Sequence, residues 1–281
     1  MIKNTILTGS SGFIGRNLTS LLSSDNAHKV ISLSRSSGID LSEDAWLEKL
    51  RSVKADSVIH LAQSKEYRNF PEGSEDMRKI NIDATAELLE WSRKNGVKRF
   101  IFASTGNVYS PSDKLLDEDS PTIPGSFYGA SKLSAEHLVN QYSKFFEIIN
   151  LRIFTVYGPN QEGMLVPNMI KSVKEGKEIS LASKKGLVVT PLFIDDCIEI
   201  LAKLIDQPLS SSLNTYNFCG SEVVSLFDIV KNIEEVLKVD AKIIVNENDP
   251  SYLTASNKKL LDLIGAYKFT DIKEGIRKTL S

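Results

Sequence analysis

Residues 3–24 read KNTILTGSSGFIGRNLTSLLSS, and this stretch decides the fold. Its first six residues form a short run with β-branched side chains, which is typical of a buried strand. Glycines follow at positions 9, 12 and 15, and apolar residues then recur at helical spacing. The stretch therefore predicts a strand, a glycine turn and a helix in direct succession.

The glycine turn suits a phosphate group. Residues without a Cβ atom let the backbone approach a pyrophosphate at the start of a helix, where free N–H groups and the helix dipole favour anions. The spacing is GxxGxxG, whereas the common dinucleotide fingerprint is GxGxxG. A turn whose glycines serve packing alone is the alternative. Because this is the first strand-to-helix turn of the chain, we favour a nucleotide site.

Strand and helix patterns keep alternating as far as residue 154. Apolar runs predict further strands at 29–34, 57–62, 99–103 and 147–154. An amphipathic stretch predicts a helix over 81–94, and a further helix is expected over 128–145. This alternation is typical of an α/β fold with a doubly wound parallel sheet, and ligands of such sheets bind beyond the carboxyl ends of the strands. The glycine turn and several polar residues fall at those ends, namely Ser34, Arg35, Gln63, Thr105 and Thr155.

The rhythm changes after about residue 160, where strands and helices become shorter and less regular. We therefore expect a dinucleotide-binding domain of the Rossmann type over 1–160. A smaller α+β lobe over 161–281 is expected to bind the substrate. Segments near 191–218 are expected to return to the first domain.

The composition is that of an ordinary soluble globular protein, with 41% hydrophobic and 25% charged residues among 281. The net charge is −2 and no basic tract stands out, so we expect no nucleic-acid partner. No run of 18 apolar residues suggests a membrane span, and the initial strand leaves no room for a signal peptide. We expect a cytoplasmic protein whose two cysteines, Cys197 and Cys219, stay reduced. No metal site is expected, because no set of His, Cys and carboxylates has ligand spacing.

A tyrosine and a lysine stand four residues apart in YGASK, at Tyr128 and Lys132. On a helix these side chains lie one turn apart on the same face. An ammonium beside a phenol lowers the phenol's pKa from about 10, which makes tyrosine usable as an acid or base. Thr105, just past the predicted strand 99–103, would approach the same point. A surface pairing without a catalytic role is the alternative.

The end of the second strand selects between NAD and NADP in such folds. Ser34 and Arg35 stand there, with no carboxylate to repel a 2′-phosphate, and a guanidinium binds phosphate well. We therefore expect NADP(H) to be preferred, with NAD(H) as the second choice. The alternative is that Arg35 is a solvated loop residue.

Nearly from end to end, the chain resembles the extended short-chain dehydrogenase/reductase family of nucleotide-sugar epimerases, dehydratases and reductases. The motifs that carry this resemblance are TGSSGFIG, VIHLA, NIDAT, FASTGNVYS, YGASK, LRIFTVYGP, FIDD, YNFCGSEVVSL and DIKEGIRKTL. The resemblance implies that Tyr128 is the acid/base and that Lys132 holds the nicotinamide ribose and lowers the tyrosine pKa. It implies that Thr105 hydrogen-bonds the reacting sugar oxygen, and that hydride transfer occurs at a sugar carbon, usually C4. It also implies a homodimer built by helices 81–94 and 128–145.

From the residues and the resemblance together we expect catalysis by Thr105, Tyr128 and Lys132. Cofactor contacts are expected from Gly9, Ser11, Gly12, Phe13, Ile14, Gly15, Ser34, Arg35, Asp40, Leu41, Leu61, Ala62, Gln63, Asn81, Tyr128 and Lys132. Substrate contacts are expected from Thr105, Asn107 and Thr155. Among these, the resemblance places Asp40 and Leu41 near the adenine and Asn81 in support of the cofactor side.

Three departures from the family pattern narrow the activity. The 4,6-dehydratases carry an acidic pair after the catalytic threonine, whereas Gly106 and Asn107 stand here, so dehydration is rejected. Thr155 replaces an asparagine found in many members. The arginine that often precedes FIDD and grips the diphosphate is missing from VVTPLFIDD, which leaves the nucleotide open.

Two enzyme activities remain. A reductase of 4-keto sugar nucleotides is slightly favoured by Ser34, Arg35 and the missing dehydratase pair. A nucleotide-sugar 4-epimerase with tightly bound NAD is the alternative, and it has the same catalytic residues. A non-catalytic NADP-binding regulator is a third hypothesis, which the intact Thr105, Tyr128 and Lys132 disfavour.

Overall fold

The computed structural model describes residues 2–24 and 27–280, and their contacts group into two compact units. The first unit comprises Met1–Ser110, Ser120–Arg152 and Ile198–Tyr216. The second comprises Pro111–Asp119, Ile153–Cys197 and Asn217–Ser281. Each unit is described by itself below. The domain ranges 1–160 and 161–281 stay a prediction.

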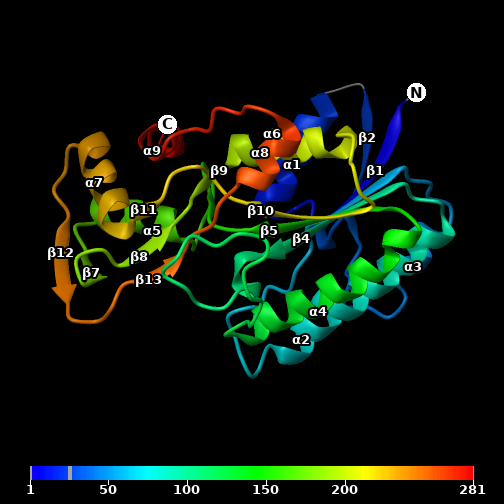
Figure 1. The fold of residues 1–281 in the computed structure, drawn as a ribbon, viewed down its shortest axis with the longest axis horizontal. Helices are drawn as coiled ribbons and strands as arrows, with labels where there is room; N and C mark the ends of the chain where they lie inside the picture. Colours follow the sequence, from blue (N-terminus) through cyan, green and yellow to red (C-terminus); the bar gives the residue numbers. More distant parts are fainter. Residues whose placement is uncertain (1, 25–26, 281) are drawn as a thin grey trace. The chain divides into compact units, whose positions relative to one another are not determined.

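A six-stranded sheet forms the centre of the first unit, in the order β10-β5-β4-β3-β1-β2 (Figure 1). Its strands are β1 (Lys3–Thr8), β2 (His28–Leu33), β3 (Ser57–His60), β4 (Arg99–Thr105), β5 (Glu147–Ile153) and β10 (Leu213–Phe218). β1 pairs in parallel with both β2 and β3, and β3 pairs in parallel with β4. The predicted doubly wound α/β fold is thus confirmed. The strand order reverses between β1 and β3, and such a switch point is where open α/β sheets bind ligands.

Helices cover both faces of this sheet, with α1 and α6 on one face and α3 and α4 on the other (Figure 1). Their bounds are α1 (Phe13–Ser24), α3 (Ala84–Lys94), α4 (Phe127–Gln141) and α6 (Ile194–Asp206). α3 and α4 pack against each other and against β4 through a core that includes Trp46, Phe100 and Phe102, all 0% exposed. Burial of these aromatic side chains supplies much of the free energy that holds this face together.

Two helices differ from the sequence-based expectation. Residues 43–52, where the sequence pattern also predicts a helical stretch, form only a 3₁₀ segment, Trp46–Leu50, and the Trp46 indole N–H donates to Glu87 at 2.6 Å. The helix expected from residue 81 is preceded by α2 (Ser74–Arg78) and a π-helical turn, Lys79–Asp83, that runs into α3. Such π turns occur often at functional sites.

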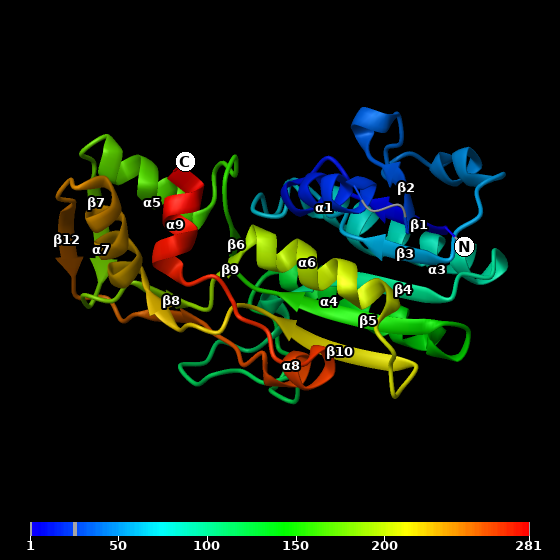
Figure 2. The same ribbon diagram turned by 90° about the horizontal axis from the view of Figure 1, so that it is seen from above.

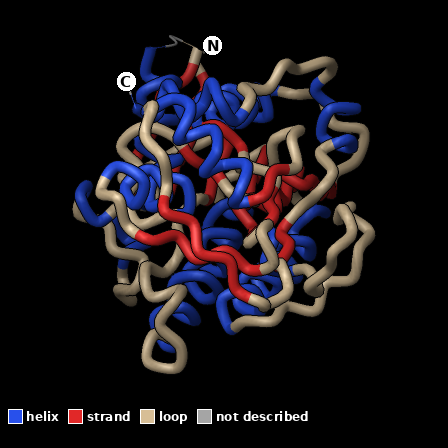
Figure 3. Tube along the Cα trace, turned by 90° about the vertical axis from the view of Figure 1, so that its left-hand side faces the viewer, coloured by secondary structure: helices blue, strands red, loops and turns tan. Residues whose placement is uncertain are grey.

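The second unit has short mixed strands and four further helices among its described residues (Figures 2 and 3). Its helices are α5 (Leu165–Lys174), α7 (Leu226–Leu237), α8 (Lys258–Ile264) and α9 (Ile272–Leu280). Its strands are β6 (Val156–Tyr157), β7 (Glu178–Ala182), β8 (Leu187–Val189), β9 (Leu192–Phe193), β11 (Val224–Ser225), β12 (Lys242–Asn246) and β13 (Ser251–Leu253). β6 pairs with β9, β7 with β12, and β8 lies between β11 and β13. α5 and α9 both pack on α7.

Candidate active site

The three glycines of the turn after β1 have different roles. Gly9 adopts a left-handed φ of 68°, and a Cβ atom there would lie 2.8 Å from the backbone nitrogen of Ala62. A Cβ atom on Gly15 would lie 2.2 Å from the Gly9 carbonyl oxygen. At Gly12 the nearest described atom would be the same oxygen, at 3.1 Å. Gly9 and Gly15 therefore close the turn, and Gly12 leaves its outer side open.

This open side fits a dinucleotide diphosphate. Ser11 and Gly12 are exposed directly before α1, and Phe13 and Ile14 begin that helix half-buried. The first turn of α1 contains no acidic side chain among its described residues. The exposed N-terminus of a 12-residue helix therefore presents backbone N–H groups and a positive dipole end without a competing carboxylate.

A buried polar chain joins the ends of β1 and β3 to α3. His60 is fully buried, and burial together with the charge of Lys132 lowers its pKa to about 3, so its ring is neutral. Its Nε2 lies 2.9 Å from Thr85 Oγ1, and that hydroxyl donates to the Asn81 carbonyl at 2.8 Å. His60 Nε2 therefore carries the proton, and Nδ1 accepts from the Thr8 hydroxyl at 2.6 Å. His60 is thus a satisfied core residue.

Asn81 continues this link toward α4. Its side chain is fully buried in the π turn, where it accepts from the Ser64 N–H at 2.9 Å and donates to Ser131 Oγ at 2.9 Å. Ser131 in turn donates to the Tyr128 carbonyl at 2.8 Å. Asn81 therefore fixes the loop after β3 against the helix that carries Tyr128. Its place on the cofactor side stays a prediction.

Tyr128 and Thr105 meet at the carboxyl end of β4. Thr105 is the last residue of the strand and is buried, and its Oγ1 accepts from Asn107 Nδ2 at 3.1 Å. The Tyr128 phenol hydrogen-bonds with Thr105 and donates to Gln63 Oε1 at 2.7 Å. Sequence-predicted residues from the ends of β3 and β4 and from α4 are thus brought to one point.

Gly129 allows α4 to start so close to this strand end. A Cβ atom on Gly129 would lie 2.3 Å from the carbonyl oxygen of Asn107 and 2.9 Å from Pro124 Cβ. The preceding Ser126 caps the helix by accepting from the Gly129 N–H at 3.1 Å. The YGASK motif predicts roles for its tyrosine and lysine, and the structure adds a role for Gly129, whose position directly after Tyr128 is the signal for it in the sequence.

The pKa of Tyr128 is raised in this structure, whereas the sequence predicts a lowered one, and the contribution of Lys132 to it stays a prediction. Burial raises the pKa of Tyr128 to about 12, and the hydrogen bond with Thr105 only partly opposes this rise. Lys132 is 1% exposed with its Nζ 4.2 Å from the centre of the Phe102 ring, and burial lowers its own pKa to about 7 against the opposing charge of Glu136. Loss of hydration is thus the largest influence on the pKa of each group.

A buried ion pair lies one turn beyond Lys132, and sequence analysis missed it. Glu136 pairs with Arg152 of β5 through contacts of 3.1 Å and 2.9 Å, and Ser104 donates to the same carboxylate. The Arg152 guanidinium lies 4.7 Å from the centre of the Tyr109 ring. The signal was an arginine inside a predicted core strand, since a buried charge requires a partner.

The residues predicted to choose the dinucleotide lie at the end of β2. Ser34 caps a 3₁₀ turn over Arg35–Ser37, and Arg35 is exposed. The Asp40 carboxylate accepts from the backbone and hydroxyl of Ser42 at 3.0 and 2.8 Å. These bonds, with a smaller contribution from the Arg35 charge, lower the pKa of Asp40. A carboxylate therefore does stand near Arg35, which weakens the argument for NADP.

The remaining predicted residues are placed as follows. Leu41 packs partly buried against the core, and Leu61 and Ala62 are half-buried after β3. Asn107 is exposed beside Thr105. Thr155 belongs to the second unit, where its carbonyl accepts from the Leu192 N–H at 2.8 Å. Asn107 therefore lies beside Thr105, the neighbour of Tyr128. Thr155 is placed within the second unit alone.

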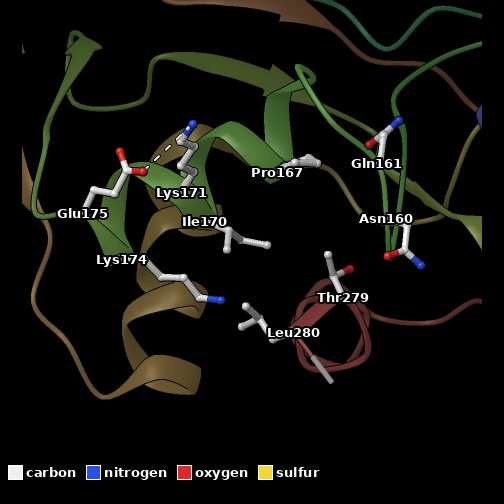
Figure 4. A pocket seen from close by; sticks show the side chains of 9 residues that line it. All are labelled: Asn160, Gln161, Pro167, Ile170, Lys171, Lys174, Glu175, Thr279 and Leu280. Atoms are coloured by element: carbon white, nitrogen blue, oxygen red, sulfur yellow. Dashed lines mark ion pairs between the residues drawn. The ribbon is translucent and has the colours of Figure 1, made fainter.

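A separate cavity of about 260 Å³ lies in the second unit between α5 and α9 (Figure 4). Pro167, Ile170 and Leu280 give it apolar walls, and Lys171 and Lys174 lie at its rim. Lys171 pairs with Glu175 at 4.0 Å. These lining residues are distinct from those that sequence analysis assigned to the site.

Within residues 2–24 and 27–280, no helix is both long and apolar enough to span a bilayer. The same ranges hold no group of three or more His, Cys, Asp or Glu side chains that could bind a metal ion. Cys197 and Cys219 are free thiols and buried, and burial raises the pKa of both.

Comparison with known proteins places this geometry in a family. The family model described as "NAD dependent epimerase/dehydratase family" matches residues 5–219. An uncharacterised UDP-glucose epimerase of Bacillus subtilis is 27% identical over 98% of this chain and 96% of its own length. The GDP-6-deoxy-D-talose 4-dehydrogenase of Aggregatibacter actinomycetemcomitans is 29% identical over 95% of this chain and 94% of its own.

Solved structures of similar fold include proteins that bind nicotinamide dinucleotides. The UDP-glucuronic acid 4-epimerase of Bacillus cereus, in complex with UDP-glucuronic acid and NAD, superposes with a TM-score of 0.86 at 26% identity, covering 98% of this chain and 97% of that one. RMD from Pseudomonas aeruginosa, complexed with NADPH, shares the fold with a TM-score of 0.85 at 22% identity, covering 99% and 97%.

The chain is a member of the NAD-dependent epimerase/dehydratase family, within the extended short-chain dehydrogenases/reductases. It is therefore an NAD(P)-dependent enzyme of nucleotide sugars.

Proposed function

We propose that this enzyme is a nucleotide-sugar 4-epimerase, the activity that sequence analysis kept as the alternative to a 4-keto reductase. The observation that carries the proposal is the meeting of Thr105 and Tyr128 next to the open glycine turn, with Lys132 one helical turn away. The similarity to a UDP-glucuronic acid 4-epimerase at 26% identity and to a UDP-glucose epimerase at 27% supports C4 chemistry on a UDP-sugar.

The glycine turn and the N-terminus of α1 would hold the diphosphate of the dinucleotide, and Lys132 would hold its nicotinamide ribose. When bound, the nicotinamide ring exchanges a hydride with the sugar carbon. Tyr128 Oη, in its ionised phenolate form, would take the proton of the sugar hydroxyl during oxidation, and the resulting phenol would return that proton during reduction. Thr105 Oγ1 would hydrogen-bond the same sugar oxygen. Asn107 holds the Thr105 hydroxyl in place, because Asn107 Nδ2 donates to Thr105 Oγ1 at 3.1 Å.

We also propose the remaining predicted contacts as parts of this site. They comprise the cofactor residues Ser11, Phe13, Ile14, Ser34, Arg35, Asp40, Leu41, Leu61, Ala62, Gln63 and Asn81, and the substrate residue Thr155. A cytoplasmic homodimer, formed through α3 and α4, is part of the same proposal. Two exposed apolar side chains support such an interface: Leu138 lies within α4, and Phe145 follows shortly after the helix.

A reductase is the second candidate, because the pKa of Tyr128 is raised to about 12. A phenol that stays protonated at neutral pH is prepared to donate a proton to a ketone, which is the acid step of reduction. The 29% identity with a GDP-6-deoxy-D-talose 4-dehydrogenase also supports oxidoreduction at C4 without epimerisation.

The two candidates differ in what the purified protein carries and needs. We expect the protein to release a nicotinamide dinucleotide on denaturation, and to interconvert the C4 epimers of UDP-glucose or UDP-glucuronate without added reductant. Ion-exchange chromatography of the nucleotides and of the sugar products measures both. An empty protein that consumes NADPH only with a 4-keto sugar nucleotide is instead a reductase. Tyr128→Phe, which removes the proton-carrying oxygen, should abolish either activity.

A further inference from the structure

Gln63 makes a direct side-chain contact with the phenol of Tyr128. It lies just beyond β3, and its Oε1 accepts from Tyr128 Oη at 2.7 Å across 65 residues of sequence. The Gln63 side chain is exposed, and Tyr128 is half-buried. Sequence analysis placed Gln63 among the cofactor contacts, a role that does not account for this bond.

The hydrogen bonds around the phenol have a definite direction. Asn107 Nδ2 donates to Thr105 Oγ1, so the Thr105 hydroxyl keeps its own hydrogen for the phenol oxygen. Tyr128 then donates its hydrogen to Gln63. The chain of donors thus ends at the Gln63 amide.

The side-chain oxygen of Gln63, Oε1, stabilises only the protonated form of Tyr128. An acceptor stabilises the neutral phenol, whereas a phenolate needs a donor at the same place. The Gln63 amide carries two N–H donors at its other end, and half a turn about its last side-chain bond would bring them to the phenolate. Exposure leaves this side chain the room to turn.

We infer that Gln63 is a positioning residue of the acid/base site, whose amide accepts from Tyr128 when the phenol is protonated and turns to donate when the phenol is ionised. This inference rests on the proposed role of Tyr128 in C4 chemistry. No atom is transferred to or from Gln63, since the proton passes between Tyr128 Oη and the sugar oxygen.

Other groups act on the phenol and remain in place when Gln63 is changed. The Tyr67 ring, from the loop after β3, lies 5.3 Å from the Tyr128 ring and raises its pKa. The Arg68 guanidinium lies 5.0 Å from the Tyr67 ring centre, and Lys132 follows one turn along α4. The contributions of these groups to the Tyr128 pKa are the same in the wild-type protein and in variants at Gln63, so they cancel in the comparison.

The test compares Gln63→Glu and Gln63→Leu with the wild type. The carboxylate of Gln63→Glu accepts but does not donate, so it should raise the Tyr128 pKa by about one unit and move the tyrosine-dependent limb of the kcat profile to higher pH by the same amount. Gln63→Leu offers neither bond and should lower kcat about tenfold or more with a smaller change in KM. Gln141→Leu makes the same chemical change at an exposed position at the end of α4 and should leave both parameters unchanged.

A spectroscopic titration separates this inference from the proposed function. The ultraviolet absorbance of tyrosinate is followed against pH for each protein, and the curve of its Tyr128→Phe counterpart is subtracted. The difference gives the Tyr128 pKa without any substrate. Gln63→Glu with an unshifted Tyr128 pKa, or Gln63→Leu with wild-type kcat, would overturn the inference. Absence of epimerase and reductase activity in the wild type contradicts the proposed function instead, and the shift in Tyr128 pKa still tests the contact.

Discussion

Burial pushes the two ionisable residues of the proposed site toward their neutral forms. Tyr128 resists losing its proton, with a pKa raised to about 12, and Lys132 resists keeping its proton, with a pKa lowered to about 7. The Tyr–Lys spacing alone predicts a lowered pKa for the phenol. The spacing indicates which charge lies nearby and how far away it is, but it does not indicate how much water each group loses on folding. Glu136, held by Arg152, is the residue that opposes the loss of the Lys132 charge.

The lowered pKa of Lys132 predicts how stability depends on pH. Below pH 7 both the folded and unfolded chains hold the proton, and the folded chain bears the cost of a buried charge. Between pH 7 and about 10.5 the unfolded chain alone holds it, so stability should rise with pH. Relative to Lys132→Met, the wild-type free energy of unfolding should gain up to about 1.4 kcal/mol per pH unit in this window.

Urea denaturation of both proteins at pH values on either side of the window measures this difference. Lys132→Met should equal or exceed the wild type in stability at the lower pH, although it lacks the proposed ribose contact. Lys65→Met, at an exposed position, is the control and should follow the wild-type curve. A constant gap between wild type and Lys132→Met at all pH values would contradict the lowered pKa.

At the scale of elements, Gly129 sets the distance between α4 and the turn after β4. A methyl group there would meet the Asn107 carbonyl oxygen at 2.3 Å, and backbone on both sides leaves little room to adjust. We expect Gly129→Ala to destabilise the fold by about 1–3 kcal/mol and to lower kcat strongly, because Tyr128 moves away from Thr105.

Thermal unfolding and steady-state kinetics measure the two effects. Gly125→Ala is the matched control, since a Cβ atom at that exposed glycine would meet no described atom within 4 Å. It should keep wild-type stability and kcat. If Gly129→Ala behaved like Gly125→Ala, the close approach of α4 to the turn after β4 would not be what aligns the hydroxyls of Tyr128 and Thr105.

The elements that sequence predicts well are those with a local pattern. Residues 3–24 carry the strand, turn and helix in their own periodicity, and α3 likewise shows apolar spacing. The contact of Gln63 with Tyr128 joins residues 65 apart, so no local pattern contains it. The segment near Trp46 likewise has a partner that no local pattern contains, because the Trp46 indole N–H donates to Glu87, 41 residues away.

At the scale of the whole molecule, a ligand that binds only the folded chain raises its stability. A dinucleotide at 100 times its dissociation constant adds about 2.7 kcal/mol, so the melting temperature reports relative affinity. The preference for NADP(H) expected from the sequence rests on Arg35, which is exposed at the end of β2, but the Asp40 carboxylate also stands near that guanidinium. Arg35 attracts a 2′-phosphate and Asp40 repels it, so these two residues set the preference together.

Arg35→Asp should therefore reduce the rise in melting temperature caused by NADPH far more than the rise caused by NADH. Asp40→Asn should act in the opposite sense, increasing the stabilisation by NADPH, because it removes a negative charge close to the expected 2′-phosphate. Arg51→Asp, at another exposed arginine of the first unit, controls for the change of net charge and should affect both dinucleotides equally. Equal losses with NADPH and NADH in Arg35→Asp would mean that Arg35 does not bind the 2′-phosphate. The choice between the two dinucleotides would then have to be made elsewhere along the carboxyl ends of the strands.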